Sequence, residues 1–255
     1  MSGTLGVDGI NLKTPAELEI MRKAGRIVSE LLKLLEKETH PGVSTQRLDE
    51  IAEEFIRSQG AEPAFKGYYG FPASICASVN EEVVHGIPGS RLLREGDVAG
   101  IDVGVKYQGF FSDAARTFAI GRVDAQSQKL IEVTREAMYA GIAQAVAGAR
   151  LSDISSAIQQ VAESKGLSVV RQFVGHGIGR NLHEEPQVPN YGKPGRGPTL
   201  QVGMALAIEP MLNLGSHEVE ILKDGWTVVT KDRKRSGHFE QTVFVGEQKA
   251  EIVTE

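Results

Sequence analysis

The chain of 255 residues contains a single cysteine, Cys76, so no disulfide bond can form within it. A protein without disulfides is typical of a reducing compartment, which favours the cytoplasm. The net charge of −5 argues against nucleic acid or a membrane surface as a partner. No apolar run approaches the ~20 residues that a membrane span needs, and the first residues lack the basic and apolar regions of a signal peptide. We therefore expect a soluble cytoplasmic protein that binds neither nucleic acid nor membrane.

Several catalytic motifs are also absent. There is no phosphate-binding P-loop, and His183-Glu184-Glu185 lacks the second histidine that an HExxH zinc site requires. No Gly-x-Ser-x-Gly elbow is present, and the sequence around Cys76 does not resemble that of a thiol-protease nucleophile. These absences argue against P-loop enzymes and against the serine, thiol and HExxH classes of hydrolase.

Apolar periodicity predicts the order helix, helix, strands, which occurs twice. The first helix is expected to begin with a capping box at residues 14–17 and to end at the His-Pro-Gly sequence of residues 40–42. The remaining elements are helices at about 44–60, 127–147 and 152–165, and strands between about 74 and 119 and from 169 onward. No Gly-, Ser- or Pro-rich linker divides the chain. We therefore predict a loose leader at residues 1–13 and a single domain at residues 14–255.

A weak internal repeat accompanies this order. Gly42 to Gly60 and Gly148 to Gly166 are equally spaced, with apolar residues in matching places between them. Two amphipathic helices of similar length can agree this well by chance, so the spacing alone leaves duplication open. A true duplication would give an α+β fold in which two related halves form one antiparallel sheet with helices on one face. A site at the centre of that sheet would take ligands from both halves.

Two aspartates, Asp102 and Asp113, stand in a segment that is typical of a β-hairpin. With a turn at residues 106–109, the two are expected to lie directly opposite each other, with Cβ atoms ~5 Å apart. Like charges in such positions destabilise a fold unless a cation lies between them or one carboxyl stays protonated. Asp102 shares its strand face with Gly100 and Gly104, which would leave room for a bulky group. The alternative is a pair of solvent-exposed aspartates that flank a turn.

Three other segments offer hard metal ligands: His176 in GHGIG, Glu209 in AIEPM and Glu240 in HFEQT. Acids on apolar strands are rarely buried without a partner, although each is equally compatible with a strand end that reaches water. The glycines beside His176 are expected to clear space around its ring. The remaining histidines outside the candidate site are assigned to ordinary core or loop positions: His40, His217 and His238.

Taken together, these four acids and one histidine would bind two divalent cations, because four carboxylates neutralise two M²⁺ ions. Oxygen-rich donors with one imidazole and no thiolate suit Mn, Fe, Co or Zn rather than soft Cu(I). Two ions ~3.5–4 Å apart can bridge a water molecule and lower its pKa from about 15.7 toward ~7. Two-metal hydrolases, aminopeptidases among them, use this chemistry.

The longer motifs resemble type I methionine aminopeptidase, the compact form of the pita-bread fold. The resemblance runs from about Lys13 to the C-terminus, and it is carried by SVNEEVVHGIPG, GIDVGVKYQGFFSDAARTF, FVGHGIGRNLHEEPQVPNYG, MALAIEPM and KDGWTVVTKDRKRSGHFEQTVFV. It implies a single catalytic metallopeptidase domain with a pseudo-two-fold antiparallel sheet and helices on one face. It also implies removal of the initiator methionine from nascent chains when the second residue is small, with a metal-bridging water or hydroxide as the nucleophile.

The resemblance further implies roles for individual residues. Two divalent ions would be held by Asp102, Asp113, His176, Glu209 and Glu240, with Asp113 and Glu240 shared by both ions. His85 would meet the scissile amide or leaving amine, His183 the substrate carbonyl, and Glu209 would be the general base. The methionine side chain would lie against Tyr68, Phe71, Cys76 and Trp226, a composition that suits a flexible thioether. The expected substrates are N-terminal Met-X peptides of nascent chains, cleaved by a monomer; a transient contact with the ribosome is left open.

The chain departs from the family's commonest pattern in a few places. Gly104 and Ala207 stand near ligands where some members carry threonine, and Gln241 stands where histidine is usual. Tyr69 and Leu182 replace a common histidine and phenylalanine near the pocket. These departures leave the metal preference and the pocket shape in question, but they remove none of the five ligands.

Related alternatives fit the sequence less well. Aminopeptidase P and proline dipeptidase usually carry a large extra N-terminal domain, whereas this chain has a short leader. A type II methionine aminopeptidase would need a helical insertion between His183 and Glu209, which are too close for it. Non-catalytic binding modules of the same fold have lost metal ligands, whereas all five candidates are present here.

Overall fold

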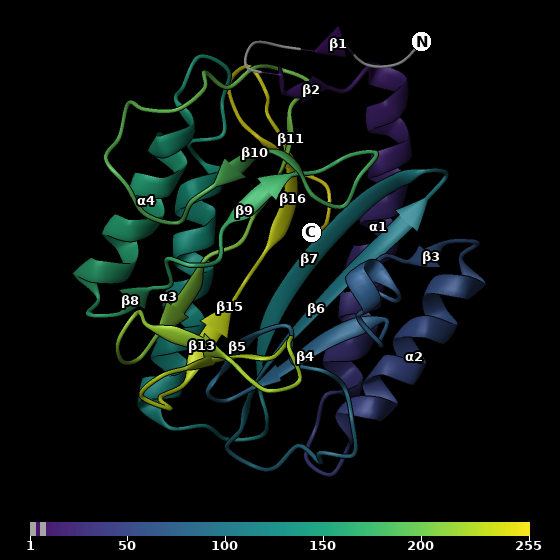
Figure 1. Cartoon of the computed structure of the whole chain (residues 1–255), viewed down its shortest axis with the longest axis vertical. Coiled ribbons are helices and arrows are strands. Elements are labelled where there is room, and N and C mark those ends of the chain that lie inside the picture. Colours follow the sequence, from purple (N-terminus) through teal and green to yellow (C-terminus); the bar gives the residue numbers. More distant parts are fainter. Residues whose placement is uncertain (1–3, 6–8) are drawn as a thin grey trace.

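The computed structural model describes residues 4–5 and 9–255, and it shows a layer of strands with helices behind it (Figure 1). Four α-helices lie in this part of the chain: α1 (Pro15–Glu38), α2 (Thr45–Ser58), α3 (Ala125–Ile142) and α4 (Leu151–Ser164). The sequence predicts all four, and each begins within two residues of its expected position. The helix α3 ends at Ile142 rather than at the expected residue 147, because Val146 forms a β-bridge with Gly246.

Side-chain caps explain where the helices begin. In α1 the Thr14 hydroxyl accepts a hydrogen bond from the Glu17 N–H, and the Glu17 carboxylate accepts one from the Thr14 N–H, which is the predicted capping box. Ser44 caps α2 and Asp124 caps α3, each through a side-chain oxygen that accepts a backbone N–H. Each cap of this kind stabilises its helix by about 1 kcal/mol.

The strands are short except for the hairpin of β6 and β7. In chain order they are β1 (Thr4–Leu5), β2 (Asn11–Leu12), β3 (Glu62–Pro63), β4 (Ile75–Val79), β5 (Glu82–Val84), β6 (Val98–Tyr107), β7 (Phe110–Ala119), β8 (Ser168–Val169), β9 (Gly175–Gly177), β10 (Glu184–Val188), β11 (Ala205–Ile208), β12 (Met211–Asn213), β13 (Val219–Ile221), β14 (Val228–Thr230), β15 (Ser236–His238), β16 (Gln241–Phe244) and β17 (Glu251–Ile252).

The strands that matter most for the site form one antiparallel layer. In the first half β4 and β7 pair with β6, and in the second half β9 and β16 pair with β11. Ala115 of β7 and Glu240 join the halves, because the N–H of each donates to the carbonyl of the other. The helices α1 and α2 lie behind the first half, and α3 and α4 lie behind the second (Figure 1). The helices thus cover one face of the layer, and the opposite face carries the candidate site.

The two halves repeat each other. Gly42 and Gly148 have φ angles of 93° and 91°, and Gly60 and Gly166 have 67° and 74°, so the corresponding turns share one conformation. In each half the N–H of the first of these glycines donates to the carbonyl of a leucine. The helices α2 and α4, which these turns enclose, have 14 residues each. The two halves thus share turn conformations and helix lengths, and the fold is the pita-bread arrangement.

Each half has its own hydrophobic core between helices and strands. In the first half α1 and α2 pack against β4 and β6, with Leu31 and Ile101 wholly buried. In the second half α3 and α4 pack against strands that include β11, with Leu130 and Leu206 wholly buried. Burial of a side chain of this size contributes about 1.5–3 kcal/mol. The two cores therefore hold the strands that carry the site in fixed positions.

The start of the described chain packs onto the second half. Ile10 is buried in the core of that half, and Lys13 Nζ lies 2.8 Å from a Glu184 carboxylate oxygen in a buried ion pair. Residues 1–3 and 6–8 of the predicted leader lie outside the described residues, and the division of the chain at residue 13 stays a prediction. Every helix within residues 4–5 and 9–255 is too short or too polar to span a membrane.

The hairpin of β6 and β7 has a different register from the predicted one. Asp102 pairs with Ala115 and Asp113 pairs with Gly104, so the two aspartates do not lie directly opposite each other. The turn has only two central residues, 108–109, whose φ angles of 48° and 83° are typical of a type I′ turn. The aspartates still share one face of the hairpin, in diagonal positions ~7 Å apart.

Candidate metal centre and active site

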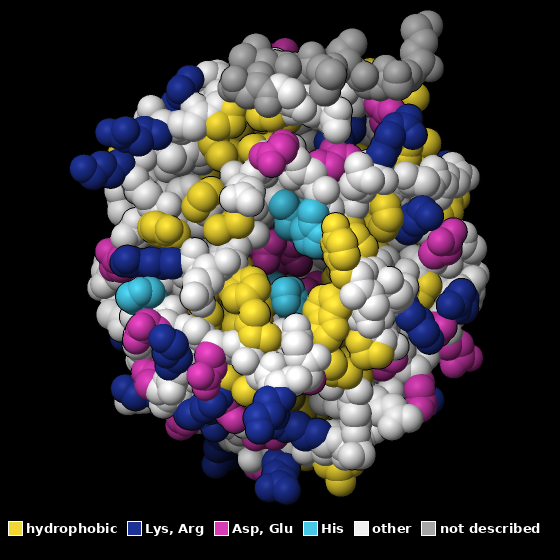
Figure 2. Space-filling view, viewed as in Figure 1, with side chains coloured by type: hydrophobic (Ala, Val, Ile, Leu, Met, Phe, Trp, Pro, Cys, Tyr) yellow, Lys and Arg dark blue, Asp and Glu magenta, His cyan; other side chains and the backbone are white. Residues whose placement is uncertain are grey.

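A cavity of about 310 Å³ opens on the strand face of the molecule. Figure 2 shows it as a hollow near the centre of this face, with acidic and histidine side chains inside and apolar side chains around it. All the residues predicted for the site line it: Tyr68, Phe71, Cys76, His85, Asp102, Asp113, His176, His183, Glu209, Trp226 and Glu240. Segments that are far apart in the sequence therefore deliver these side chains to one place.

The candidate metal ligands come from both halves of the fold. Asp102 lies on β6, Asp113 on β7, His176 on β9, Glu209 directly after β11 and Glu240 directly before β16. The first two strands belong to the first half and the other three to the second. The cluster therefore lies where the halves meet, as the internal repeat predicts.

The glycines on either side of His176 allow close packing of the strands. A Cβ atom at Gly175 would lie 2.4 Å from the Ala207 carbonyl oxygen, and one at Gly177 would lie 2.2 Å from the Glu185 carbonyl oxygen. Backbone atoms therefore fill the space that the sequence assigned to the imidazole. Only glycine at both positions lets β9 approach its neighbours this closely and present His176 to the cavity.

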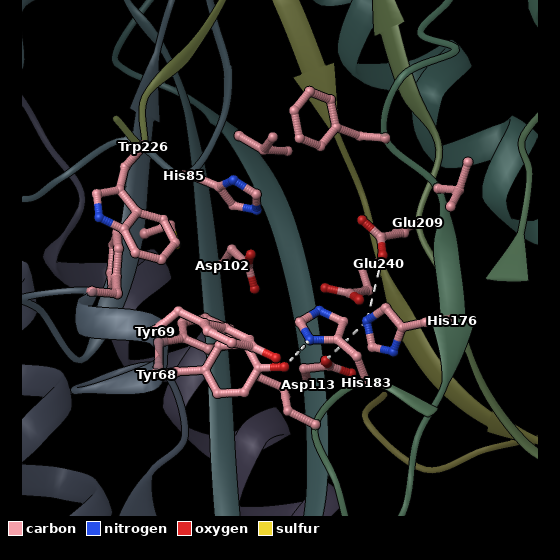
Figure 3. Close-up of a pocket in the computed structure, with 17 residues that line it drawn as sticks. Tyr68, Tyr69, His85, Asp102, Asp113, His176, His183, Glu209, Trp226 and Glu240 are labelled. Atoms are coloured by element: carbon pink, nitrogen blue, oxygen red, sulfur yellow. Dashed lines mark hydrogen bonds and ion pairs between the residues drawn. The ribbon is translucent and has the colours of Figure 1, made fainter. Parts of the chain in front are cut away.

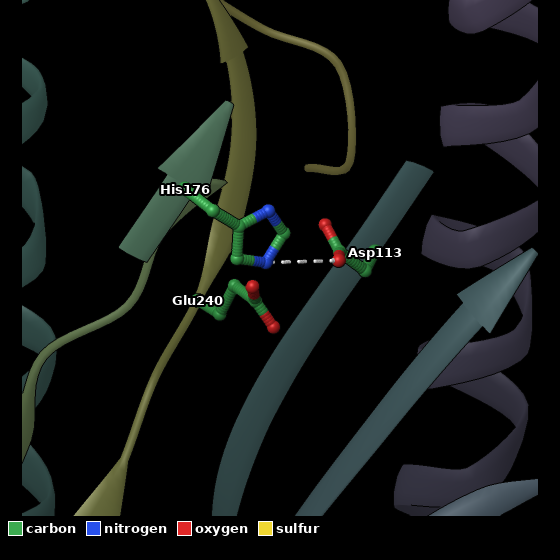
Figure 4. Close-up of side chains that lie close together, drawn as sticks. All are labelled: Asp113, His176 and Glu240. Carbon is green, nitrogen blue, oxygen red and sulfur yellow. Dashed lines mark ion pairs between the residues drawn. The ribbon is translucent and has the colours of Figure 1, made fainter. Parts of the chain in front are cut away.

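The innermost group consists of Asp113, His176 and Glu240, which each offer a ligand atom within 4.8 Å of the others (Figure 4). His176 Nε2 lies 3.6 Å from Asp113 Oδ2 and 3.5 Å from Glu209 Oε1. Two donors that are each ~2.1 Å from a shared ion lie roughly 3–3.6 Å apart, so these distances suit a common ion. His176 Nδ1 donates to the Gly177 carbonyl at 2.9 Å. This hydrogen bond orients the ring with Nε2 toward the carboxylates.

Asp113 is held in place by the second half of the fold. The Thr242 hydroxyl lies 3.0 Å from Asp113 Oδ1, and it also accepts a hydrogen bond of 3.1 Å from the Asp113 N–H. One carboxylate oxygen is thereby fixed on Thr242, and the other stays on the His176 side. Contacts of this kind orient a ligand before the metal binds.

Burial works against the charged form of the four acids. It raises the pKa of Asp102 and the pKa of Glu209 to about 8, and it also raises the pKa of Asp113 and of Glu240. Asp102 Oδ1 is buried and finds no hydrogen-bond partner among residues 4–5 and 9–255. A nearby cation would restore the charged form of such carboxyls, and this oxygen-rich donor set is one that divalent metals prefer. The residues present therefore fit a pair of divalent ions.

Two further histidines, His85 and His183, face the cavity beside the acids (Figure 3). Burial lowers the pKa of each to about 4, so both rings are neutral at pH 7. A hydrogen bond of 2.7 Å joins the Tyr68 hydroxyl to His183 Nδ1; when the hydroxyl donates, the neutral ring carries its proton on Nε2. His85 has a positive φ of 60°, a conformation that non-glycine residues adopt at a cost of about 1–3 kcal/mol and that is common at functional sites.

An apolar wall lies beside the acids. Phe71 and Trp226 meet edge to face, with ring centroids 5.1 Å apart, and Cys76, Phe65 and Ile87 pack with them. Burial raises the pKa of the Cys76 thiol well above its usual value, so the thiol stays uncharged. The wall is therefore apolar and polarisable, as a thioether side chain requires.

Three of the departures from the family pattern lie beneath the cavity. A Cβ atom at Gly104 would lie 2.5 Å from the Phe65 ring, so this glycine makes room for a side chain of the protein rather than for a ligand. Ala207 pairs with His176 across β11 and β9 and is wholly buried. Gln241 is buried and accepts a hydrogen bond from the Thr254 hydroxyl. None of the three is among the residues that line the cavity.

The other two departures do line the cavity. Leu182 is buried in its wall, whereas Tyr69 is 86% exposed and has a positive φ of 46°. The Tyr69 ring contacts Tyr68 edge to face, with centroids 4.6 Å apart. These are therefore the two departures that contribute directly to the wall and rim of the cavity.

The sequence analysis missed several residues of the site. Phe65, Phe173 and Val174 line the cavity, although the last two stand at the start of the FVGHGIG segment beside His176. His238, which was assigned to an ordinary core or loop position, is buried with its Nε2 3.6 Å from Glu209 Oε2. One signal was available, because His238 precedes Glu240 by two residues and an extended chain places such residues on one side.

A cluster of buried hard ligands at the centre of a pita-bread fold defines a metal-dependent hydrolase. The chain belongs to metallopeptidase family M24, whose family model matches residues 19–247.

Individual relatives are similar over nearly the whole chain. The methionine aminopeptidase of Clostridium perfringens is 56% identical over 245 residues, which cover 96% of this chain and 98% of that protein. Methionine aminopeptidase 1 of Bacillus subtilis is 54% identical over 242 residues, which cover 95% and 98%. The crystal structure of methionine aminopeptidase from Thermotoga maritima superimposes with a TM-score of 0.95 at 46% identity and covers 96% of this chain and 99% of that chain.

Proposed function

We propose that this chain is an aminopeptidase that removes an N-terminal methionine when the second residue is small. One observation carries the proposal: the cluster of hard ligands and the apolar wall of Phe71, Cys76 and Trp226 line one cavity. A peptide that enters end-on can place its free amine at the acids and its first side chain against that wall. The methionine aminopeptidases of the two bacteria above, similar over nearly the whole chain, support this substrate.

The metal site in this proposal holds two divalent ions of Co, Mn, Fe or Zn. The residues that would hold these ions are Asp102, Asp113, His176, Glu209 and Glu240, which line one cavity. Ions bound there supply Lewis acidity, which lets water act as a nucleophile near neutral pH and polarises the scissile carbonyl.

The side chains carry out the remaining steps. Glu209 takes a proton from the attacking water and later passes it to the leaving amine, while the hydroxyl adds to the carbonyl carbon and the C–N bond breaks. His183 is neutral and has its proton on Nε2, so it donates to the carbonyl oxygen as negative charge develops there. His85, which is also neutral, contacts the scissile amide or the leaving amine.

The selectivity for the second residue is assigned to the segment around His85. Val84 lines the cavity there, while Ile87 packs on the apolar wall, so this segment bounds the space beyond the scissile bond. One misfitting methylene in such a space changes selectivity by about 1–3 kcal/mol, or roughly 10–200-fold.

The proposed setting is the cytoplasm, where a monomer acts on nascent chains with at most a transient contact with the ribosome. The single cysteine is buried in the cavity wall, so the fold needs no oxidising compartment. The substrates of this proposal are the N-terminal Met-X segments that new chains present.

The test compares two peptides that differ only at the first residue, Met-Ala-Ser and Pro-Ala-Ser, and measures the metal content of the protein in parallel. We expect rapid release of methionine, little release of proline and divalent metal in the active protein. Preferred cleavage of the proline peptide would assign the chain to the proline-specific branch of the fold. A metal-free protein that cleaves neither peptide after addition of Co²⁺ or Mn²⁺ would contradict an enzymatic function.

A further inference from the structure

His238 is a buried histidine with an unexplained nitrogen. It ends β15, and its side chain is 4% exposed. Its Nε2 has no hydrogen-bond partner within the described ranges 4–5 and 9–255. A buried polar atom without a partner costs about 1–3 kcal/mol, so a nitrogen left in this state in the metal-free site needs an explanation.

The nitrogen is aimed at a proposed metal ligand. His238 Nε2 lies 3.6 Å from Glu209 Oε2, while His176 Nε2 lies 3.5 Å from Glu209 Oε1. The Glu209 carboxylate therefore lies between two imidazoles, with one oxygen toward each. A distance of 3.6 Å is just too long for a hydrogen bond. A small rotation of the carboxylate that moves Oε2 by a few tenths of an ångström would bring it within hydrogen-bond distance of His238 Nε2.

The two imidazoles differ in their access to the cavity. His176 is among the residues that line it, and His238 is not. His238 therefore approaches Glu209 from behind the cavity wall, where it can hold the carboxylate but is poorly placed to reach an ion in the cavity.

The backbone of His238 is fixed. Its N–H donates to the Thr117 hydroxyl at 2.9 Å, and its carbonyl accepts from the same hydroxyl at 2.7 Å. It also pairs with Met211 across β15 and β12. The imidazole is consequently presented from a rigid position, and Glu209 is the partner that adjusts.

We propose that His238 is a positioning residue for Glu209: its Nε2–H donates to Oε2 in the metal-loaded protein and so turns Oε1 toward the ion on the His176 side. The inference rests on the proposed ligand set but not on the identity of the peptide substrate. A donor that holds one oxygen of a ligating carboxylate fixes the direction of the other. Loss of such an outer contact typically costs 10–100-fold in metal affinity.

The experiment uses the full chain and CoCl₂ alone as the probe, under anaerobic conditions. Metal-free wild-type protein is compared with His238→Leu, which lacks a donor, and with His238→Gln, which keeps an N–H at a similar reach. His238→Asn has the same amide on a shorter side chain. The exposed variant His217→Gln controls for stray binding of Co²⁺ to a surface imidazole. Calorimetry gives the affinity, the visible spectrum of bound Co²⁺ reports its ligand atoms, and thermal unfolding without metal shows that each variant is folded.

We expect His238→Leu and His238→Asn to bind Co²⁺ about 10–100-fold more weakly, and His238→Gln to recover most of the affinity with the wild-type Co²⁺ spectrum. Two results would overturn the inference. Wild-type affinity in both the Leu and Asn variants would show that the imidazole does not hold Glu209. Weak binding in all three variants with an altered Co²⁺ spectrum in the Gln variant would show that His238 is itself a ligand. Failure of the unsubstituted chain to bind Co²⁺ would instead count against the proposed function.

Discussion

His85 and His183 lie against the acid cluster as neutral rings, because burial lowers the pKa of each to about 4. The hydrogen bond between the Tyr68 hydroxyl and His183 Nδ1 orients the imidazole; in the proposed mechanism the hydroxyl donates, and Nε2–H is the donor to substrate. A neutral donor of this kind stabilises negative charge that develops on an oxygen without attracting the metal's own ligands. The role of His183 thus depends on Tyr68 as well as on burial.

Replacement of His183 by alanine should lower kcat more than it raises KM, because the lost hydrogen bond strengthens in the transition state. Tyr68→Phe removes only the hydroxyl, so it should change kcat in the same direction by a smaller factor. Steady-state kinetics on Met-Ala-Ser for both variants provides the measurement. If His183→Ala changes KM alone, the residue acts in ground-state binding and the assignment fails.

Asp113 faces His176 with one carboxylate oxygen and Thr242 with the other. The substitution Asp113→Asn removes its charge and should abolish tight binding of at least one ion. The metal-free variant should be at least as stable as the wild type, since repulsion among buried acids decreases. Elemental analysis and melting curves without metal test both statements; two bound ions with near-normal turnover would show that Asp113 is not a shared ligand.

The hairpin of β6 and β7 sets the distance between Asp102 and Asp113. Its two-residue turn requires positive φ at both central positions, and Gly109 supplies one of them at no steric cost. Gln108 has a positive φ of 48°, which is unusual for a residue with a long side chain. The register that separates the aspartates therefore depends on a turn whose two central residues do not line the cavity.

Gly109→Ala should lower the free energy of unfolding by about 1 kcal/mol, because a Cβ atom disfavours positive φ. Gln108→Gly should leave stability unchanged or raise it, since the same strain is relieved. Chemical denaturation of the metal-loaded proteins measures both, and kcat/KM on Met-Ala-Ser should stay near the wild-type value. Equal stability of Gly109→Ala and wild type would contradict the turn assignment.

The helices could be predicted from the sequence because their signals are local. The capping box at Thr14, the cap at Ser44 and the glycines that follow α2 and α4 act within one or two turns of chain. The hairpin register could not be predicted, because Gly109 is the only turn signal at its tip and Gln108 resembles a strand residue. Moving the centre of the turn by one position changes the partner of Asp113 from Asp102 to Gly104.

The whole molecule places one acid from each half in an equivalent position. Asp102 and Glu209 stand at the same number of residues from the starts of β6 and β11, the central strands of the two halves. From their motifs, the sequence predicted the acids and the histidine that the fold brings together in one cavity; their role as metal ligands stays a prediction. The spacing of His238 from Glu240 indicates only the side on which His238 lies, because its contact with Glu209 depends on how β15 packs beside β12 and Thr117.

Removal of the metal should make stability depend on pH in a defined direction. Asp102 and Glu209 have pKa values of about 8 in the folded metal-free protein, above their unfolded values. The stability that they contribute is therefore fully present below pH ~4 and lost as the pH rises through about 8. From pH 6.5 to 8.5, above the range in which His85 and His183 titrate, the metal-free protein should lose roughly 2 kcal/mol per carboxyl.

Thermal unfolding with and without metal over that pH range tests this expectation. The metal-loaded protein should show a smaller decrease, because bound cations keep the carboxylates charged at all of these pH values. Asp102→Asn and Glu209→Gln should each flatten the curve of the metal-free protein. A metal-free wild type whose stability rises with pH would show that these acids are ionised without metal.

The most direct test of the account is kcat/KM of the metal-loaded protein on Met-Ala-Ser, Met-Lys-Ser and Leu-Ala-Ser. The apolar wall of Phe71, Cys76 and Trp226 should accept the thioether and exclude the branched leucine side chain, while the segment around His85 should exclude a large second residue. We predict that kcat/KM for Met-Ala-Ser exceeds that for either of the other peptides by a factor of roughly 10–200 or more. Comparable values for all three peptides would show a general aminopeptidase and would contradict the proposed methionine pocket.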